Sequence, residues 1–208
     1  MRFMVEEKIK IEENIIKEIV GRAIPKTTND QNTDDIIPAR FMKEITFANM
    51  GKYAYYDERY KDGKEIADHP LNKYKGANIL IGGANYGCGS SREHAPQALS
   101  RYGIKAVIAE SFAEIFAGNC ASLGVVGVTI ARNELDALAS AITSSPEMEV
   151  KIDLENKKVS YAGKEIPLEI IEGRRQSFLN GTWDALTILA QNQAGIKKVE
   201  SGLEYLKF

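Results

Sequence analysis

The sequence predicts an α/β fold, because apolar runs of strand length alternate with helical segments through the middle of the chain. The apolar runs cover residues 77–83, 104–109 and 125–130, and helical patterns cover residues 92–101 and 111–123. Strands that alternate with helices usually pair in parallel, because each helix carries the chain back across the sheet. We therefore expect a sheet that is at least partly parallel at its centre.

The pattern changes after Pro146 towards short strands joined by tight turns, so the C-terminal third is expected to be more antiparallel. The expected elements there are two hairpin strands, a further strand, a helix and a loose tail, over residues 149–154, 157–161, 166–171, 177–190 and 197–208.

The N-terminal part is less regular. Residues 15–20 are rich in isoleucine and end at Gly21, which favours a strand, and residues 41–60 mix aromatic and charged residues in a pattern compatible with a helix. We expect one domain over residues 1–208, in which residues 1–20 are an N-terminal extension and residues 191–208 a C-terminal tail.

The composition is that of an ordinary globular protein. The chain has 208 residues, 44% of them hydrophobic and 27% charged, with a formal net charge of −2. A near-neutral balance argues against a nucleic-acid or membrane-surface protein. No run approaches the roughly 18 apolar residues that a membrane span needs. The first ten residues carry Glu6 and Glu7 and lack the apolar centre of a secretory signal, which favours the cytoplasm.

Cysteine and histidine are scarce. Cys88 and Cys120 do not have the spacing of a zinc or redox pair, and a reducing compartment is the simplest setting for them. Iron–sulfur clusters normally take at least three cysteine ligands. We therefore expect this chain to bind no such cluster on its own, and we expect Cys120 to be a core residue.

A glycine-rich loop lies between the first central strand and the helix that follows it. Gly87 and Gly89 allow close backbone approach or positive φ. Ser90 or the next serine is the expected N-cap of the helix, and Ser90 and Glu93 have the spacing of a capping box. Because a helix N-terminus attracts anions, and Arg92 adds a two-pronged donor, the loop is a candidate carboxylate site.

Other interpretations of this loop remain open at this point. Many α/β proteins have a glycine-rich loop before a capped helix with no site there. A phosphate site is disfavoured, because the loop matches neither of the two common phosphate-binding glycine patterns. Acyl transfer by Ser90 is also disfavoured, because the serine is not in a Gly-x-Ser-x-Gly turn and His94 lies in the same helical turn.

The run from Tyr86 to Pro96, Tyr-Gly-Cys-Gly-Ser-Ser-Arg-Glu-His-Ala-Pro, resembles the signature of the swivelling domain in the aconitase superfamily. In detail it is similar to the small subunits of isopropylmalate dehydratases. Further segments resemble that family in the same order, at residues 21–22, 32–41, 104–119 and 181–184. The matches span most of the chain, which makes them more specific than any one glycine pattern.

The resemblance implies a swivelling β/β/α domain like the C-terminal domain of aconitase, in a heteromeric hydro-lyase. Such enzymes interconvert 2-isopropylmalate and 3-isopropylmalate through 2-isopropylmaleate, in leucine biosynthesis. The resemblance also implies a large-subunit partner that carries a 4Fe–4S cluster, and a small hydroxy-dicarboxylate substrate.

Site residues carry over from the family by position. Ser90 would transfer the proton next to a substrate carboxylate, and Ser91 and Arg92 would bind a carboxylate. A free serine is a weak base, so its alkoxide needs a positive environment. Asp34 matches a family aspartate near the active site, and the simpler role for it is to cap a loop.

The segment from Arg40 to Glu44 falls where relatives distinguish the variable group of the substrate. Arg40 and Lys43 are the basic candidates there, and the following aromatic residues could instead be a packed helix face. Homoaconitate, citraconate and dimethylmalate remain alternative substrates. A stand-alone anion-binding module is the alternative from another class, and RNA binding is disfavoured by the absence of an aromatic–basic motif.

Overall fold

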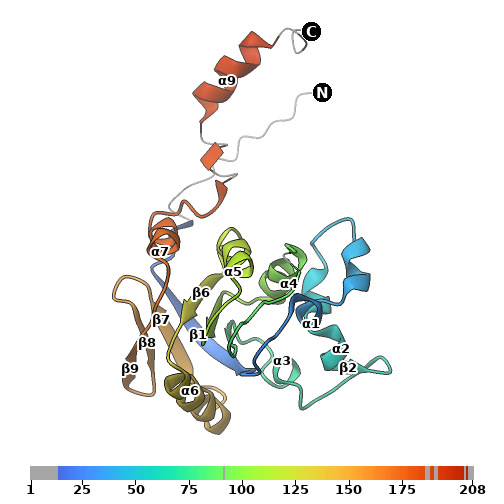
Figure 1. The fold of residues 1–208 in the computed structure, drawn as a ribbon, viewed down its shortest axis with the longest axis vertical. Helices are drawn as coiled ribbons and strands as arrows, with labels where there is room; N and C mark the ends of the chain where they lie inside the picture. The colour runs from blue at the N-terminus through green and yellow to red at the C-terminus, as the bar shows by residue number, and fades with distance from the viewer. Residues whose placement is uncertain (1–13, 91, 186–187, 190–191, 204, 206–208) are drawn as a thin grey trace.

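A computed structural model describes residues 14–90, 92–185, 188–189, 192–203 and 205. Its centre is a seven-stranded sheet in the order β6-β5-β4-β1-β7-β8-β9 (Figure 1). The parallel half consists of β1 (Glu18–Pro25), β4 (Ile79–Ile81), β5 (Ala106–Ala109) and β6 (Val126–Thr129). The antiparallel half consists of β7 (Glu149–Asp153), β8 (Lys158–Tyr161) and β9 (Lys164–Pro167). The expected mixture of parallel and antiparallel pairing is thus confirmed.

Strand β1 joins the two halves, since it pairs in parallel with β4 and antiparallel with β7. The sheet also curls round on itself. The amide of Thr129, at the end of β6, donates to the carbonyl of Glu169 at 2.9 Å, and the amide of Glu169 donates back at 2.8 Å. This bridge joins the chain just after β9 to the opposite end of the sheet.

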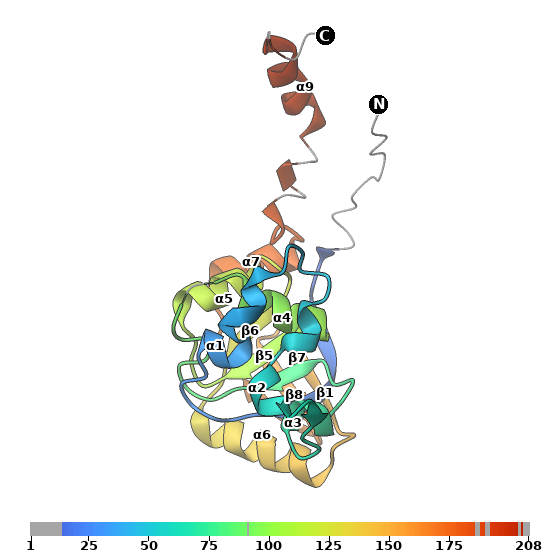
Figure 2. The ribbon, with the colours of Figure 1, turned by 90° about the vertical axis from the view of Figure 1, so that its right-hand side faces the viewer.

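The helices that connect the strands along the chain lie on the outside of the sheet. Figures 1 and 2 both place α4 (His94–Tyr102) and α5 (Glu114–Ala121) on one side of the body and α6 (Arg132–Ser144) on the opposite side. Helix α4 ends as expected at Gly103, whose φ of 111° lets its amide reach the carbonyls of Leu99 and Ser100. Helix α6, which buries three apolar side chains, was not among the predicted elements.

The long connection between β1 and β4 contains only short elements. They are α1 (Thr33–Ile36), the 3₁₀ turns η2 (Ala39–Lys43) and η3 (Met50–Tyr53), α2 (Tyr56–Arg59), β2 (Tyr60–Lys61), β3 (Lys64–Glu65) and α3 (Pro70–Lys73). The expected helix over residues 41–60 is therefore wrong. Two features interrupt it: Tyr55 has a φ of 51°, and Gly51 lies so close to α4 that an added Cβ would be 2.3 Å from the Arg101 carbonyl oxygen.

The chain ends also differ from expectation. The strand predicted over residues 15–20 is confirmed for residues 18–20, but it is the start of the central strand β1 and not part of an added extension. Residues 1–13 lie outside the described range. Helix α7 (Glu172–Leu179) begins five residues before the predicted position of 177. The loose tail predicted at residues 197–208 overlaps helix α9 (Gln193–Gly202), which projects from the body in Figures 1 and 2.

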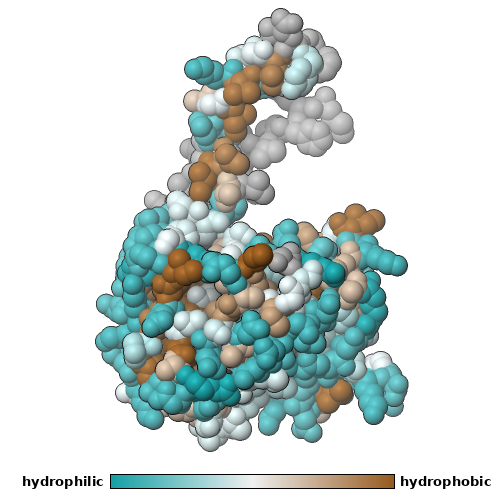
Figure 3. All heavy atoms as spheres, in the orientation of Figure 1, coloured by the Kyte–Doolittle hydropathy of each residue, from teal (hydrophilic) through white to brown (hydrophobic). Residues whose placement is uncertain are grey.

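The projecting segment is amphipathic. Leu189 and Val199 are exposed by 65% and 63%, and Ile196 by 45%. Figure 3 shows apolar side chains gathered along this segment, away from the body. Isolated helices of this length are marginal in water, and in proteins the packing of an apolar face supplies most of their stability. No helix in the described part of the chain is long and apolar enough to span a membrane.

Candidate functional site

The glycine-rich loop, residues 82–93, lies beside the segment that follows β1. The amide of Thr33 donates to the Cys88 carbonyl at 2.9 Å, and the amide of Gly87 donates to the Gln31 carbonyl at 2.8 Å. The Thr33 hydroxyl also donates to the Ser90 carbonyl at 2.9 Å. Because β1 and β4 are parallel neighbours, their carboxyl ends deliver both segments to one edge of the sheet, where ligands commonly bind in α/β folds.

Gly87 fulfils its expected role in this loop. Its φ is 79°, and an added Cβ would lie 2.1 Å from the Phe116 ring on α5. Only a residue without a side chain can adopt this conformation at this distance from the ring. The loop is thereby packed directly on the core.

The predicted capping box is not formed. Helix α4 begins at His94 with Glu93 as its N-cap, without a side-chain capping bond, and the Glu93 carboxylate instead accepts from Gln97 at 3.0 Å. The reason is Pro96. A helix capped by Ser90 would place this proline in the second turn, where it lacks the N–H to donate and its ring clashes with a carbonyl, whereas it fits in the first turn.

Asp34 and Arg92 lie together beside the loop that holds Ser90. The Arg92 guanidinium is 3.5 Å from the Asp34 carboxylate, and both Ser90 and Asp34 are exposed. The cap of α1 is formed by Asn32 and Asp35, whose side chains bond each other's backbone amides. The Asp34 side chain is thus left to face Arg92. Ser91 lies outside the described residues.

The two basic candidates in η2 differ in their surroundings. Arg40 forms an ion pair with Asp57 that includes a hydrogen bond of 2.8 Å, and its guanidinium lies 4.6 Å from the Phe41 ring centre. Hydrogen bonding to Asp57 raises the pKa of Arg40 above its ordinary value. Lys43 is exposed and makes no side-chain hydrogen bond or ion pair within the described ranges.

Met42 is a contact that the sequence did not reveal. Its sulfur accepts from the Arg92 guanidinium at 2.7 Å, so η2 touches the residue expected to hold the substrate. Thioether sulfur is only a weak acceptor, and nothing in the sequence distinguishes this methionine from one in a core.

Comparison with known proteins settles the family. A family model described as the aconitase C-terminal domain matches residues 13–133. The 3-isopropylmalate dehydratase small subunit of a Synechocystis species is 43% identical over 193 residues, which is 92% of this chain and 95% of that protein. The protein of the same name from a strain of Thermus thermophilus is 43% identical over 90% of this chain and 94% of its own length. The chain belongs to the family of 3-isopropylmalate dehydratase small subunits.

A solved structure agrees with this membership. The 3-isopropylmalate dehydratase structure from Methanocaldococcus jannaschii superposes with a TM-score of 0.63 at 26% identity, and the match covers 87% of this chain and 98% of that one. The expected fold class, the swivelling domain of the aconitase superfamily, is confirmed.

The glycine-rich loop, which we call the serine loop because it holds Ser90, is anchored by a buried tyrosine pair. The hydroxyls of Tyr55 and Tyr86 are 2.7 Å apart, and both side chains are fully buried. Burial raises the pKa of Tyr55 and of Tyr86, so both phenols stay neutral. Lys26 lies 4.6 Å above the Tyr55 ring and bonds Glu58 at 2.7 Å. The pair ties the chain after η3 to the serine loop.

The cysteines of this family member do not form a ligand set. Burial raises the pKa of the Cys120 thiol, which lies in the core as expected, and also that of the half-buried Cys88 thiol. The Cys88 thiol donates to the Asp30 carbonyl at 3.4 Å. Within the described ranges, no group of three or more histidine, cysteine, aspartate or glutamate residues could hold a metal ion. These residues therefore do not fit a cluster.

Proposed function

We propose that this chain is the small subunit of a heteromeric hydro-lyase that interconverts 2-isopropylmalate and 3-isopropylmalate through 2-isopropylmaleate, in leucine biosynthesis. Its membership of the small-subunit family is the observation that carries the proposal. The partner is a large subunit that carries a 4Fe–4S cluster. We place the protein in the cytoplasm and treat residues 1–208 as one aconitase-type domain.

The chemistry assigned to this chain is proton transfer. The Ser90 hydroxyl oxygen, as the alkoxide, takes the proton from the carbon beside a substrate carboxylate and returns a proton on rehydration. Arg92 binds that carboxylate, and Ser91 adds a hydroxyl donor. The exposure of Ser90 and the contact of Arg92 with Asp34 and Met42 support this arrangement, because an alkoxide needs a fixed positive neighbour.

The contacts around η2 favour an alkyl-bearing substrate. A tricarboxylate needs an additional free cation, but Arg40 is already paired with Asp57, which leaves Lys43. Met42 presents a thioether beside Arg92, which suits an isopropyl group. The homoaconitate, citraconate and dimethylmalate reactions remain the alternatives for the same machinery.

The test is an anaerobic assay of the purified chain with the large subunit of the same organism, after cluster reconstitution. Formation of the unsaturated intermediate from 3-isopropylmalate is followed by ultraviolet absorbance. Ser90→Ala is expected to lower kcat by roughly 10²–10⁴-fold. Ser122→Ala, an exposed serine at the end of α5, is the matched control and keeps wild-type activity.

Each outcome is informative. Undiminished activity in Ser90→Ala would rule out its role in proton transfer. Turnover of citraconate or dimethylmalate substrates without turnover of isopropylmalate would keep the mechanism and change the substrate. Specific binding of inorganic phosphate by the isolated chain, with no turnover of any hydroxy-acid, would favour the anion-binding module.

A further inference from the structure

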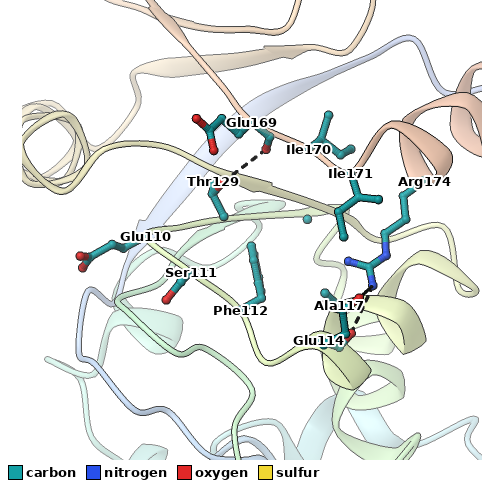
Figure 4. Close-up of a pocket in the computed structure, with 11 residues that line it drawn as sticks. Glu110, Ser111, Phe112, Glu114, Ala117, Thr129, Glu169, Ile170, Ile171 and Arg174 are labelled. Atoms are coloured by element: carbon teal, nitrogen blue, oxygen red, sulfur yellow. Dashed lines mark hydrogen bonds and ion pairs between the residues drawn. The ribbon is translucent and has the colours of Figure 1, made fainter.

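A pocket of about 480 Å³ lies at the carboxyl ends of β5 and β6, between α5 and α7 (Figure 4). We refer to it as the carboxyl-edge pocket. Phe112 and Ile171 form its apolar wall. Its charged lining residues are Glu110, Glu114, Glu169 and Arg174. In Figure 4, Phe112 and Ile171 point into the centre, and Glu110 and Glu169 direct their carboxylates outward on the same side.

One wall of the pocket is hydrogen-bonded to the serine loop. The Ser111 hydroxyl on its wall accepts from the Asn85 amide at 2.8 Å, and the Tyr86 amide donates to the Ser111 carbonyl at 2.9 Å. The Ala113 amide donates back to the Tyr86 carbonyl at 3.0 Å. One wall of the pocket is therefore paired directly with the first residues of the loop that holds Ser90.

The charge of the lining disfavours a dicarboxylate. Three carboxylates line the pocket with one guanidinium, and that guanidinium, Arg174, is paired with Glu114 at 3.2 Å. Glu110 is paired with Arg132 from outside the pocket at 3.3 Å. Among the described residues, Glu169 has no side-chain ion pair. The pocket therefore favours a cation over the anionic substrate.

Two exposed isoleucines lie in the lining of the pocket or next to it in the sequence. Ile171 is 51% exposed, and Ile115, on α5 next to the lining residue Glu114, is 58% exposed. Exposed large apolar side chains around a hollow are typical of protein interfaces, whose centres combine apolar contact with a few satisfied charges.

We propose that the carboxyl-edge pocket is a docking site for the large subunit and receives an apolar side chain flanked by a lysine or arginine. The inference rests on the proposed function: if Ser90 and the cluster of the large subunit act on one substrate, the large subunit covers the edge that carries the serine loop. The pocket is part of that edge. An aliphatic stem packs on Phe112 and Ile171, and its basic neighbour meets Glu169.

The experiment measures the dissociation constant of the assembled subunits by anaerobic sedimentation velocity. Glu169→Lys places a like charge against the incoming cation and is expected to raise the dissociation constant roughly tenfold at about 0.05 M salt, and less at about 0.5 M. Ile171→Asp tests the apolar wall and is expected to weaken assembly at both salt concentrations. Glu149→Lys is the matched control, because Glu149 is exposed on β7 and, in the described part of the chain, forms no ion pair.

The control is expected to stay within about twofold of wild type, and excess large subunit is expected to restore the activity of Glu169→Lys. Equal dissociation constants for Glu169→Lys and Glu149→Lys, with a wild-type complex that assembles and turns over isopropylmalate, would overturn the docking site alone. A wild-type chain that neither assembles with the large subunit nor supports turnover would overturn the proposed function together with the docking site.

Discussion

The parallel and antiparallel halves share one sheet but contribute differently to the molecule. The described candidate site residues follow β1 or β4, and the carboxyl-edge pocket follows β5 and β6. The hairpin strands β7, β8 and β9 carry none of the candidate site residues, although the chain after β9 supplies Glu169, Ile171 and Arg174 to the pocket, and the family model ends at residue 133, before β7. Parallel strands end at the same edge and gather their loops there, whereas antiparallel strands alternate their turns between edges.

Two glycines give the sharpest comparison between the halves. Gly87 in the serine loop and Gly163 in the β8–β9 turn have similar φ values of 79° and 77°. An added Cβ would meet the Phe116 ring at 2.1 Å in the first case and nothing within 4 Å in the second. Substitution by alanine at each of the two positions therefore separates the cost of backbone strain, which both share, from the cost of overpacking, which only residue 87 has.

The largest effect is expected for Gly87→Ala. Left-handed backbone costs about 1–2 kcal/mol for alanine at either site, and overpacking adds about 1–3 kcal/mol at residue 87 alone. Urea unfolding is expected to show the difference, and Gly163→Ala is expected to keep full activity with the large subunit, unlike Gly87→Ala. Equal losses of unfolding free energy would contradict the close contact with Phe116.

Arg92→Gln is expected to have the next largest effect. A hydrogen bond to a charged group contributes about 1.5–3 kcal/mol, which corresponds to a loss of roughly 10–100-fold in kcat/KM. Steady-state kinetics of the assembled enzyme measure it, and Arg101→Gln, an exposed arginine on α4, is the control. The same kcat/KM in both variants would remove Arg92 from the substrate site.

The buried tyrosines provide a third comparison. Tyr55→Phe leaves the Tyr86 hydroxyl buried without its partner, at a cost of about 1–3 kcal/mol. Tyr161, on β8, already has a buried hydroxyl with no hydrogen-bond partner among the described residues, so Tyr161→Phe is expected to be neutral or stabilising. Chemical denaturation measures both variants.

A double-mutant cycle of Tyr55→Phe and Tyr86→Phe tests the pairing itself. Because the second substitution removes a hydroxyl that is already unsatisfied, the double variant is expected to lose less than the sum of the single variants. Additive losses would show that the two hydroxyls do not depend on each other.

The smallest effect is expected for Glu58→Gln, on the unfolding free energy at acidic pH. Burial works against the charged form of Glu58, but the His69 imidazole 3.5 Å away and a hydrogen bond from Lys26 hold its pKa below the ordinary 4.5. A lowered pKa contributes stability above the unfolded value, and that contribution is lost as the pH falls through the folded value. Glu58→Gln is therefore expected to flatten the fall of unfolding free energy below about pH 4.5.

Glu165→Gln is the control for this titration, because it removes an exposed partner of Lys158 in the antiparallel half. Exposed pairs contribute little, so its acid profile is expected to follow wild type. A Glu58→Gln profile identical to that of wild type would show that the half-buried ion pair with Lys26 does not contribute to acid stability.

The parallel half could be predicted from the sequence because its signals are local. Buried strands are continuous apolar runs, and Gly103 marks the end of α4. The helix expected over residues 41–60 failed because tertiary packing overrides composition there, through Gly51 against α4. The expected loose tail was wrong because Ile196 and Val199 stand three residues apart, a helical spacing, and both belong to α9.

The candidate site was predictable to the extent that it depends on a contiguous motif. Ser90 and Arg92 lie within one run, and resemblance to the family added Asp34. The contacts of Met42 with Arg92 and of Tyr55 with Tyr86 join residues 50 and 31 positions apart. No local pattern encodes such contacts, whereas the failed capping box could have been recognised from Pro96.

The bridge between Thr129 and Glu169 has a consequence for solubility. An open sheet has unpaired amides and carbonyls along its two edge strands, and these can pair with strands from other molecules. Here the end of β6 is paired with the chain after β9, and β9 itself carries Lys164, Glu165 and Pro167, residues that discourage edge-to-edge pairing. A subunit made separately from its partner is thereby protected from aggregation while it waits for assembly.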